Sequence, residues 1–134
     1  MTDFIFQLES TYAELPQVLF SKLSPTPVRQ PGVVLFNEKL ANEIGLNLSD
    51  MSKEVRADLF AGNFVPEGTE PFAQAYAGHQ FGNFTMLGDG RAIVLGEHLT
   101  PSGQRLDLQL KGSGRTPYSR GGDGRAALGP MLRE

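Results

Sequence analysis

The clearest periodic pattern in the chain is the alternation of polar and apolar residues over Arg105–Lys111. Its leucines fall on one side of an extended chain, and the charged and amide side chains between them fall on the other. Such alternation predicts a β-strand with one buried face. The Thr-Pro-Ser-Gly run at residues 100–103 is typical of a tight turn, so an antiparallel neighbour is expected before it.

Two more strands are expected upstream of this turn. Residues 81–87 are expected to form one strand and the mostly apolar residues 91–97 the next, with Gly88-Asp89-Gly90 as the turn between them. Together with Arg105–Lys111 they predict three antiparallel strands joined by tight turns, which is a β-meander. Residues 72–77 are expected to add a short helical segment in front of it.

Helical patterns dominate the middle of the first half. Residues 36–46 are expected to form a short helix, which Asn37 caps and Gly45 ends. Leu40 and Ile44 stand four residues apart and therefore share one face of it.

A second helix is expected over residues 52–61, with Val55 and Leu59 pointing inward and Gly62 at its end. Residues 1–32 contain four prolines, which break any long element. We therefore expect that stretch to be extended chain that wraps around the rest.

Composition excludes several classes of protein. The chain has 134 residues, 40% of them hydrophobic and 20% charged, which is typical of one soluble domain. No apolar run is long enough to span a bilayer, and the first residues do not resemble a targeting signal. There is no cysteine, and two histidines are too few for a histidine-based zinc site. A cytoplasmic location without a membrane partner is expected.

Charge and glycine are concentrated in the same part of the chain. Residues 105–134 hold six basic and three acidic side chains, a balance of +3, which leaves −6 for residues 1–104 out of a net −3. Twelve of the sixteen glycines fall within residues 78–129. A basic, glycine-rich segment in an acidic chain indicates a local anion site and not a nucleic-acid surface.

Three features of this region point to phosphate binding. In Gly88-Asp89-Gly90-Arg91, glycines let backbone N–H groups approach phosphate oxygens and the arginine adds a planar cation; the alternative is a plain hairpin turn. Lys111 follows that segment by one strand, in the order of a kinase N-lobe; the alternative is a solvated lysine.

The loop of residues 112–125 is the third feature. Its glycines and its arginines at 115, 120 and 125 predict an anion-binding nest, unless it is a flexible surface loop. Asp123 could cap a turn, hold an arginine, or accept from adenine or ribose. Neither phosphate-loop nor dinucleotide fingerprints are complete. His79 has no visible catalytic partner, and Tyr76 and Tyr118 are interpreted as packing or loop residues.

Two long runs carry a resemblance to a known family. PFAQAYAGHQFGNFTMLGDGRAIVLGE at residues 71–97 and LQLKGSGRTPYSRGGDGRAALGPMLRE at residues 108–134 resemble the selenoprotein O family, known in bacteria as YdiU. The resemblance implies a kinase-like fold that binds ATP in a flipped orientation. It implies transfer of AMP to Ser, Thr or Tyr hydroxyls of proteins with Mg²⁺; transfer of UMP with Mn²⁺ is attributed to bacterial members.

The resemblance also assigns residues. Those it places at the nucleotide are Gly88, Gly90, Arg91, Lys111, Asp123 and Gly124. Lys111 would bind the phosphates, and Glu134 falls where the family's helix glutamate pairs with that lysine. The general base and the metal ligands are expected beyond Glu134, so this segment holds no catalytic residue or metal ligand of its own.

The expected organisation is an α+β, kinase-like N-lobe with an antiparallel β-meander and flanking short helices. Residues 1–70 would be a wrapping, helical extension and residues 71–134 the nucleotide-binding part. A helix begins at Gly129-Pro130 and has only one turn before the sequence stops, so we expect the natural protein to continue and this segment alone to be inactive. The rivals are a kinase-like phosphotransferase, a UMP transferase and a non-catalytic pseudokinase scaffold.

Overall fold

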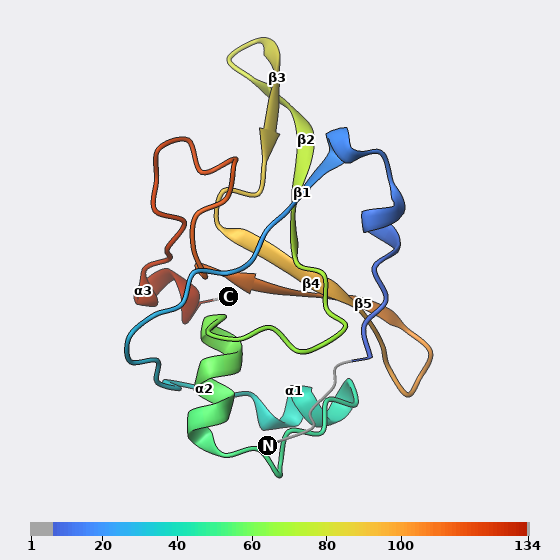
Figure 1. Cartoon of the computed structure of the whole chain (residues 1–134), viewed down its shortest axis with the longest axis vertical. Helices are drawn as coiled ribbons and strands as arrows, with labels where there is room; N and C mark the ends of the chain where they lie inside the picture. The colour runs from blue at the N-terminus through green and yellow to red at the C-terminus, as the bar shows by residue number, and fades with distance from the viewer. Residues whose placement is uncertain (1–6, 134) are drawn as a thin grey trace.

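An antiparallel sheet stands at the centre of the fold in this computed structural model, which describes residues 7–133. Within that range the sheet has five strands in the order β1-β2-β4-β5, with β3 beside β2 (Figure 1). The strands are β1 (Phe20–Lys22), β2 (Phe72–Gln80), β3 (Asn83–Gly88), β4 (Ala92–Leu99) and β5 (Arg105–Lys111). The chain is therefore an α+β protein, as expected.

The expected meander is wrong in its strand pairing. Strand β3 pairs with the outer half of β2, not with β4, and β2 meets β4 only at the pair Phe72–Val94. The hairpin turn lies at Phe81 and Gly82, whose φ angles of 53° and 78° suit a type I′ turn between twisted strands. Residues 88–90 are thus a link between two ladders, and the β2–β3 hairpin projects from the body (Figure 1).

The helical segment expected at residues 72–77 is also wrong, because these residues begin β2. Alternate alanines give the stretch a local preference for helix. Its first residues lie between β1 and β4, and Phe72 and Ala73 are buried there. Strand pairing on both sides outweighs the weak local preference.

Strand β5 has the bounds that its alternation predicts, and its ladder with β4 runs from Ala92 opposite Lys111 to Leu99 opposite Arg105. The register shifts between Val94 and Gly96. A Cβ on Gly96 would lie 2.8 Å from the carbonyl oxygen of Glu9, so the glycine lets the N-terminal segment run against β4.

Asn37 caps the first helix as expected, and Ser52, expected as the first residue of the second helix, is its cap. The Asn37 side chain accepts the N–H of Leu40 at 3.0 Å before α1 (Glu38–Glu43), and Ser52 accepts the N–H of Val55 at 3.2 Å before α2 (Lys53–Ala61). Gly62 ends α2 with a φ of 81°. On α1 the buried residue is Ala41, whereas Leu40 is half exposed.

The remaining helical pieces are short. Two 3₁₀ turns, η1 (Thr11–Glu14) and η2 (Gln17–Leu19), precede β1, and α3 (Leu128–Met131) follows the glycine-rich loop where a helix start is expected. Across the described residues, no helix has the length and apolar character needed to cross a bilayer.

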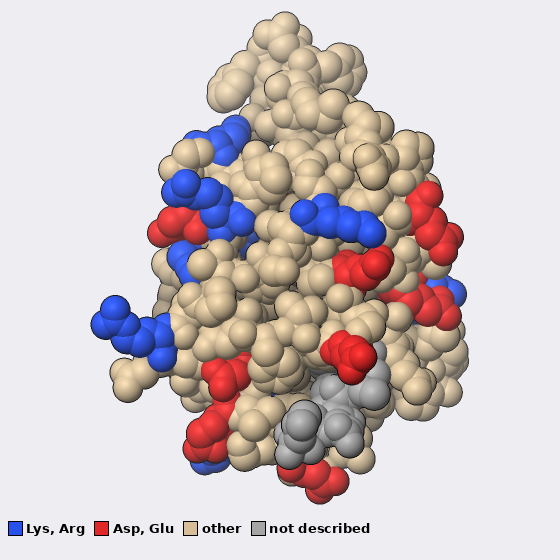
Figure 2. All heavy atoms as spheres, viewed as in Figure 1, with Lys and Arg blue, Asp and Glu red and all other residues tan. Residues whose placement is uncertain are grey.

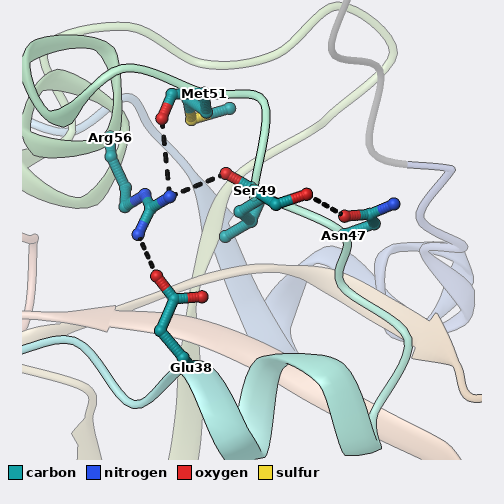
Figure 3. A network of polar contacts seen from close by, with 6 residues as sticks. Glu38, Asn47, Ser49, Met51 and Arg56 are labelled. Carbon is teal, nitrogen blue, oxygen red and sulfur yellow. Dashed lines mark hydrogen bonds and ion pairs between the residues drawn. The ribbon is translucent and has the colours of Figure 1, made fainter.

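Arg56 joins the two longer helices through several contacts at once (Figure 3). Its guanidinium donates to the Glu38 carboxylate and to the Leu48 carbonyl, both at 2.7 Å. It also lies 4.5 Å from the centre of the Phe36 ring. Because the Arg56 side chain is only 11% exposed, the aromatic face and the carbonyl replace most of its water.

Two clusters of buried apolar side chains stand out among residues 7–133. One, between the helices and the sheet, is formed by Leu48, Met51 and Leu59; the other, at the start of β2, is formed by Phe20, Phe72 and Val94. Val55 packs against the first cluster, so both inward positions predicted for α2 are confirmed. The second cluster fixes the N-terminal end of β2, and the link at residues 88–90 lies beside this end because Asp89 bonds to Gln74.

Glu97 makes the stability of this fold sensitive to acid. Its carboxylate, buried on β4, accepts from the Thr11 hydroxyl and, at 2.7 Å, from the Arg105 guanidinium. These bonds, that from Thr11 foremost, hold the pKa of Glu97 below its ordinary 4.5. Their stabilisation is fully present above that value and is lost as the pH falls through the lowered pKa.

We therefore expect Glu97→Gln to reduce the difference in unfolding free energy between about pH 6 and about pH 3. Denaturant unfolding at both pH values measures it. Glu67→Gln, at an exposed loop position, is the control and should leave the difference unchanged. Equal acid sensitivity in the wild type and the Glu97 variant would contradict the assignment.

Candidate nucleotide site

A pocket of about 550 Å³ opens where the base of the β2–β3 hairpin meets the loop after β5. The hairpin contributes Tyr76 and Met86, the link to β4 contributes residues 88–91, and the loop contributes residues between Pro117 and Arg125. Lys and Arg side chains gather on the side of the molecule where Figure 1 places this loop (Figure 2). The pocket therefore combines glycine backbone with nearby basic side chains.

Most of the residues expected at the nucleotide lie together in this pocket. Those that line it are Gly88, Gly90, Arg91, Asp123 and Gly124. Lys111 does not line it; it stands on β5 opposite Ala92, which does. Glu134, the expected partner of Lys111, lies outside the described residues, so that ion pair stays a prediction.

Gly88 is required by close packing. A Cβ at this position would lie 2.3 Å from the Tyr118 ring and 2.6 Å from the Gln74 carbonyl oxygen. The Tyr118 hydroxyl lies 2.9 Å from the Ser21 hydroxyl on β1. Tyr118 therefore links the loop to β1 through its hydroxyl and packs its ring over Gly88. The interpretation as a packing or loop residue misses the hydrogen bond to β1.

Asp89 is a pocket residue to which the sequence pattern assigns no role of its own. Its carboxylate accepts the N–H of Gln74 at 3.0 Å, while its own N–H donates to the Gln74 carbonyl at 2.8 Å. The side chain thus continues the β2 ladder beyond Gly88. Burial raises the pKa of Asp89, and the hydrogen bond from Gln74 opposes that rise in part. The position of Asp89 between two glycines is the sequence signal that could have indicated this structural role.

Asp123 caps a turn, one of the three roles considered for it. Its carboxylate accepts the N–H of Arg125 at 2.9 Å, the pattern of an Asx turn. Gly124, next in the chain, has a φ of 71°, and a Cβ there would lie 1.9 Å from the Gly114 carbonyl oxygen. The turn folds residues 121–125 back onto the start of the loop.

The basic side chains of the loop do not act as one group. Arg120 and Arg125 line the pocket with Arg91, whereas Arg115 does not. Arg125 also donates to the Thr26 carbonyl at 3.1 Å, so it braces the loop against the N-terminal segment. Arg91 and Arg120 are exposed and can reach an anion in the pocket.

Other candidates are placed elsewhere. His79 stands near the tip of the hairpin, with its ring centre 4.9 Å from that of Phe84, and does not line the pocket. Tyr76 does line it, half exposed. Between residues 7 and 133, no three His, Asp or Glu side chains gather closely enough to hold a metal ion.

Comparisons with known proteins agree with the motifs. The family model for "Protein adenylyltransferase SelO" matches residues 4–134. Proteins named "Protein nucleotidyltransferase YdiU" from Anoxybacillus flavithermus and Geobacillus kaustophilus are 65% and 64% identical over 129 residues, 96% of this chain. The relative of the same name from Nitrosococcus oceani is 61% identical over 132 residues, 98% of this chain.

The same comparisons show how much of the relatives' length this chain covers. The matched region is 27% of the length of each of these three relatives, so the chain spans about a quarter of the curated relatives it matches. The family model covers nearly every residue of the sequence. The chain therefore belongs to the family described as protein adenylyltransferase SelO.

Proposed function

We propose that this chain forms the nucleotide-binding part of a protein adenylyltransferase that uses ATP. The observation that carries the proposal is the pocket, in which two glycine-rich segments and three arginines meet. Glycine backbone offers N–H groups to phosphate oxygens, and guanidinium groups neutralise their charge. The family to which the chain belongs is named for adenylyl transfer.

Individual roles follow from this proposal. The link with Gly88, Gly90 and Arg91 contacts the nucleotide, and Asp123 with Gly124 closes the pocket on the loop side. Lys111 reaches the phosphates from the neighbouring strand, held by Glu134. Strands β2 to β5 are then the sheet of a kinase-like N-lobe, with residues 1–70 and their helices as its extension.

The proposed reaction is attack of a protein hydroxyl on the α-phosphorus of ATP. The oxygen of a Ser, Thr or Tyr side chain forms a bond to phosphorus, the bond to the bridging oxygen breaks, and pyrophosphate leaves. The hydroxyl proton passes to a general base, for which we propose no residue of this chain. Arg91 and Arg120 stabilise charge on the phosphates. Mg²⁺ or Mn²⁺ is expected from the resemblance, and none of the roles assigned to this chain's residues depends on the metal.

Lys111→Ala is expected to weaken ATP binding about tenfold or more, which corresponds to about 1.4 kcal/mol, because a phosphate-neutralising charge is lost. Calorimetry with ATP on the protein at its natural length measures it. Lys39→Ala removes an exposed lysine that pairs with Glu43 along α1, and this variant should bind ATP like the wild type.

The outcomes separate the rival functions. If ATP does not bind, the enzyme proposal fails and a scaffold takes its place. If ATP binds, the protein is incubated with a protein substrate and equal concentrations of ATP and UTP, and mass spectrometry identifies the main added group as AMP, UMP or phosphate. Addition of phosphate or UMP would overturn the proposed adenylyl transfer while leaving the nucleotide pocket in place.

A further inference from the structure

The two glycine-rich segments of the pocket are tied together by side-chain hydroxyls. The Thr116 hydroxyl donates to the carbonyl of Asp89, and the Ser119 hydroxyl donates to the carbonyl of Gly90 at 2.7 Å. A main-chain bond of 2.7 Å from Gly112 to the carbonyl of Arg91 continues the row. The carbonyls of Asp89, Gly90 and Arg91 therefore all face the loop. We call Thr116 and Ser119 the hydroxyl clasp.

The clasp is itself held in place. The Ser119 hydroxyl accepts the N–H of Thr116 at 2.9 Å, and the Thr116 hydroxyl accepts the N–H of Tyr118 at 3.1 Å. Thr116 is buried, with 5% of its surface exposed. Each hydroxyl therefore both donates and accepts within the protein, and its direction is fixed.

The direction of the carbonyls sets the direction of the neighbouring N–H groups. In a trans peptide the C=O of one residue and the N–H of the next point to opposite sides, and there is no cis peptide among the described residues. Because the clasp holds the carbonyls of Asp89 and Gly90, the N–H groups of Gly90 and Arg91 point away from its hydroxyls. Gly90 and Arg91 both line the pocket, which places these two peptide groups at its wall.

We propose that Thr116 and Ser119 are positioning residues that orient the backbone N–H groups of Gly90 and Arg91 toward the phosphate chain of the nucleotide. This inference rests on the proposed function and names the part of the ligand that the clasp serves. Without the hydroxyls, the peptides around Gly90 can turn over, since glycine resists such rotation least. A turned peptide presents a carbonyl oxygen to the phosphate, which repels it.

The test compares ligands that differ in phosphate. ATP and adenosine are titrated calorimetrically into the protein at its natural length, as wild type, Ser119→Ala and Thr116→Val. The dissociation constant for ATP is expected to rise about tenfold in each variant, the size of one lost buried hydrogen bond. That for adenosine should change less than about twofold. Ser119→Thr and Thr116→Ser keep a hydroxyl and should restore most of the ATP affinity.

The possible failures are distinct. If the wild type binds ATP and the two clasp variants bind it equally well, the clasp inference is wrong and the proposed function stands. Parallel losses for ATP and adenosine would show that the hydroxyls only maintain the pocket as a whole, which also overturns the inference. If the wild type binds no ATP, the proposed function fails and the inference falls with it. Ser119→Ala decides the matter if Thr116→Val does not fold.

Discussion

Gly124→Ala is expected to abolish ATP binding and to destabilise the protein by about 3 kcal/mol or more. The glycine has a φ of 71°, and an added Cβ would lie 1.9 Å from the Gly114 carbonyl oxygen and 2.6 Å from the Arg115 nitrogen. These are main-chain atoms, which cannot rotate aside as a side chain would. The loop must therefore open, and the pocket loses one wall. Denaturant unfolding and calorimetry with ATP measure the two effects.

Gly121→Ala is the matched control in the same loop. Its φ of 81° imposes a similar backbone strain, but an added Cβ would meet nothing within 4 Å. We expect a cost of about 1–2 kcal/mol from backbone strain alone, with ATP binding retained. Equal damage from the two substitutions would show that the close approach of Gly124 to Gly114 is not what holds the loop.

Phe72→Ala is expected to lower the free energy of unfolding by about 3–5 kcal/mol. The ring is 2% exposed, stacks on Tyr12 with 5.3 Å between ring centres, and meets Phe20 edge-on at 5.8 Å. Alanine would leave a cavity at the point where β2 pairs with both β1 and β4. Urea unfolding followed by circular dichroism gives the loss.

Phe81→Ala provides the comparison at the other end of the hairpin. Phe81 is 99% exposed, and alanine keeps the Cβ that experiences the positive φ of the turn. The change in unfolding free energy should stay within about 0.5 kcal/mol. A large loss at Phe81, or a small one at Phe72, would mean that burial in this fold does not determine where stability resides.

The elements that the sequence predicts well are those with a local physical cause. Strand Arg105–Lys111 follows from strict alternation, and both helix starts follow from side chains, Asn37 and Ser52, that accept backbone N–H groups. The α2 end at Gly62 follows from a left-handed φ. In each case the determining contact lies within a few residues along the chain.

The predictions of secondary structure are wrong where contacts between residues far apart in the sequence determine the fold. Residues 72–77 resemble a helix by local preference, and only their position between β1 and β4 makes them a strand. The same pairing takes β3 away from β4, so the turn-like residues 88–90 join two ladders. Strand β1 does not follow from the sequence pattern, because three residues within a proline-rich stretch produce no periodic signal.

The site shows the same division. The glycines and the motif resemblance single out residues 88–91 and 123–124, and the fold brings them to one pocket. The parts that hold the pocket in shape, Asp89 and Tyr118 among them, act through contacts with β1 and β2 that no spacing reveals. Whether Lys111 and Glu134 serve the nucleotide stays a prediction.

The two ends of strand β2 have different partners and should therefore differ in flexibility. Near Phe72 it is bonded on both sides and sealed by aromatic rings, so its amide hydrogens there should exchange with solvent among the slowest in the protein. Toward Gln80 its partner is β3, in an uncharged ribbon that projects from the body, where exchange should be fast. The pocket lies where the doubly paired part of β2 meets the projecting hairpin. We therefore expect the side of the pocket near the start of β2 to be rigid and the side formed by the β2–β3 hairpin to be flexible. The hairpin can then adapt to a ligand without disturbing the core.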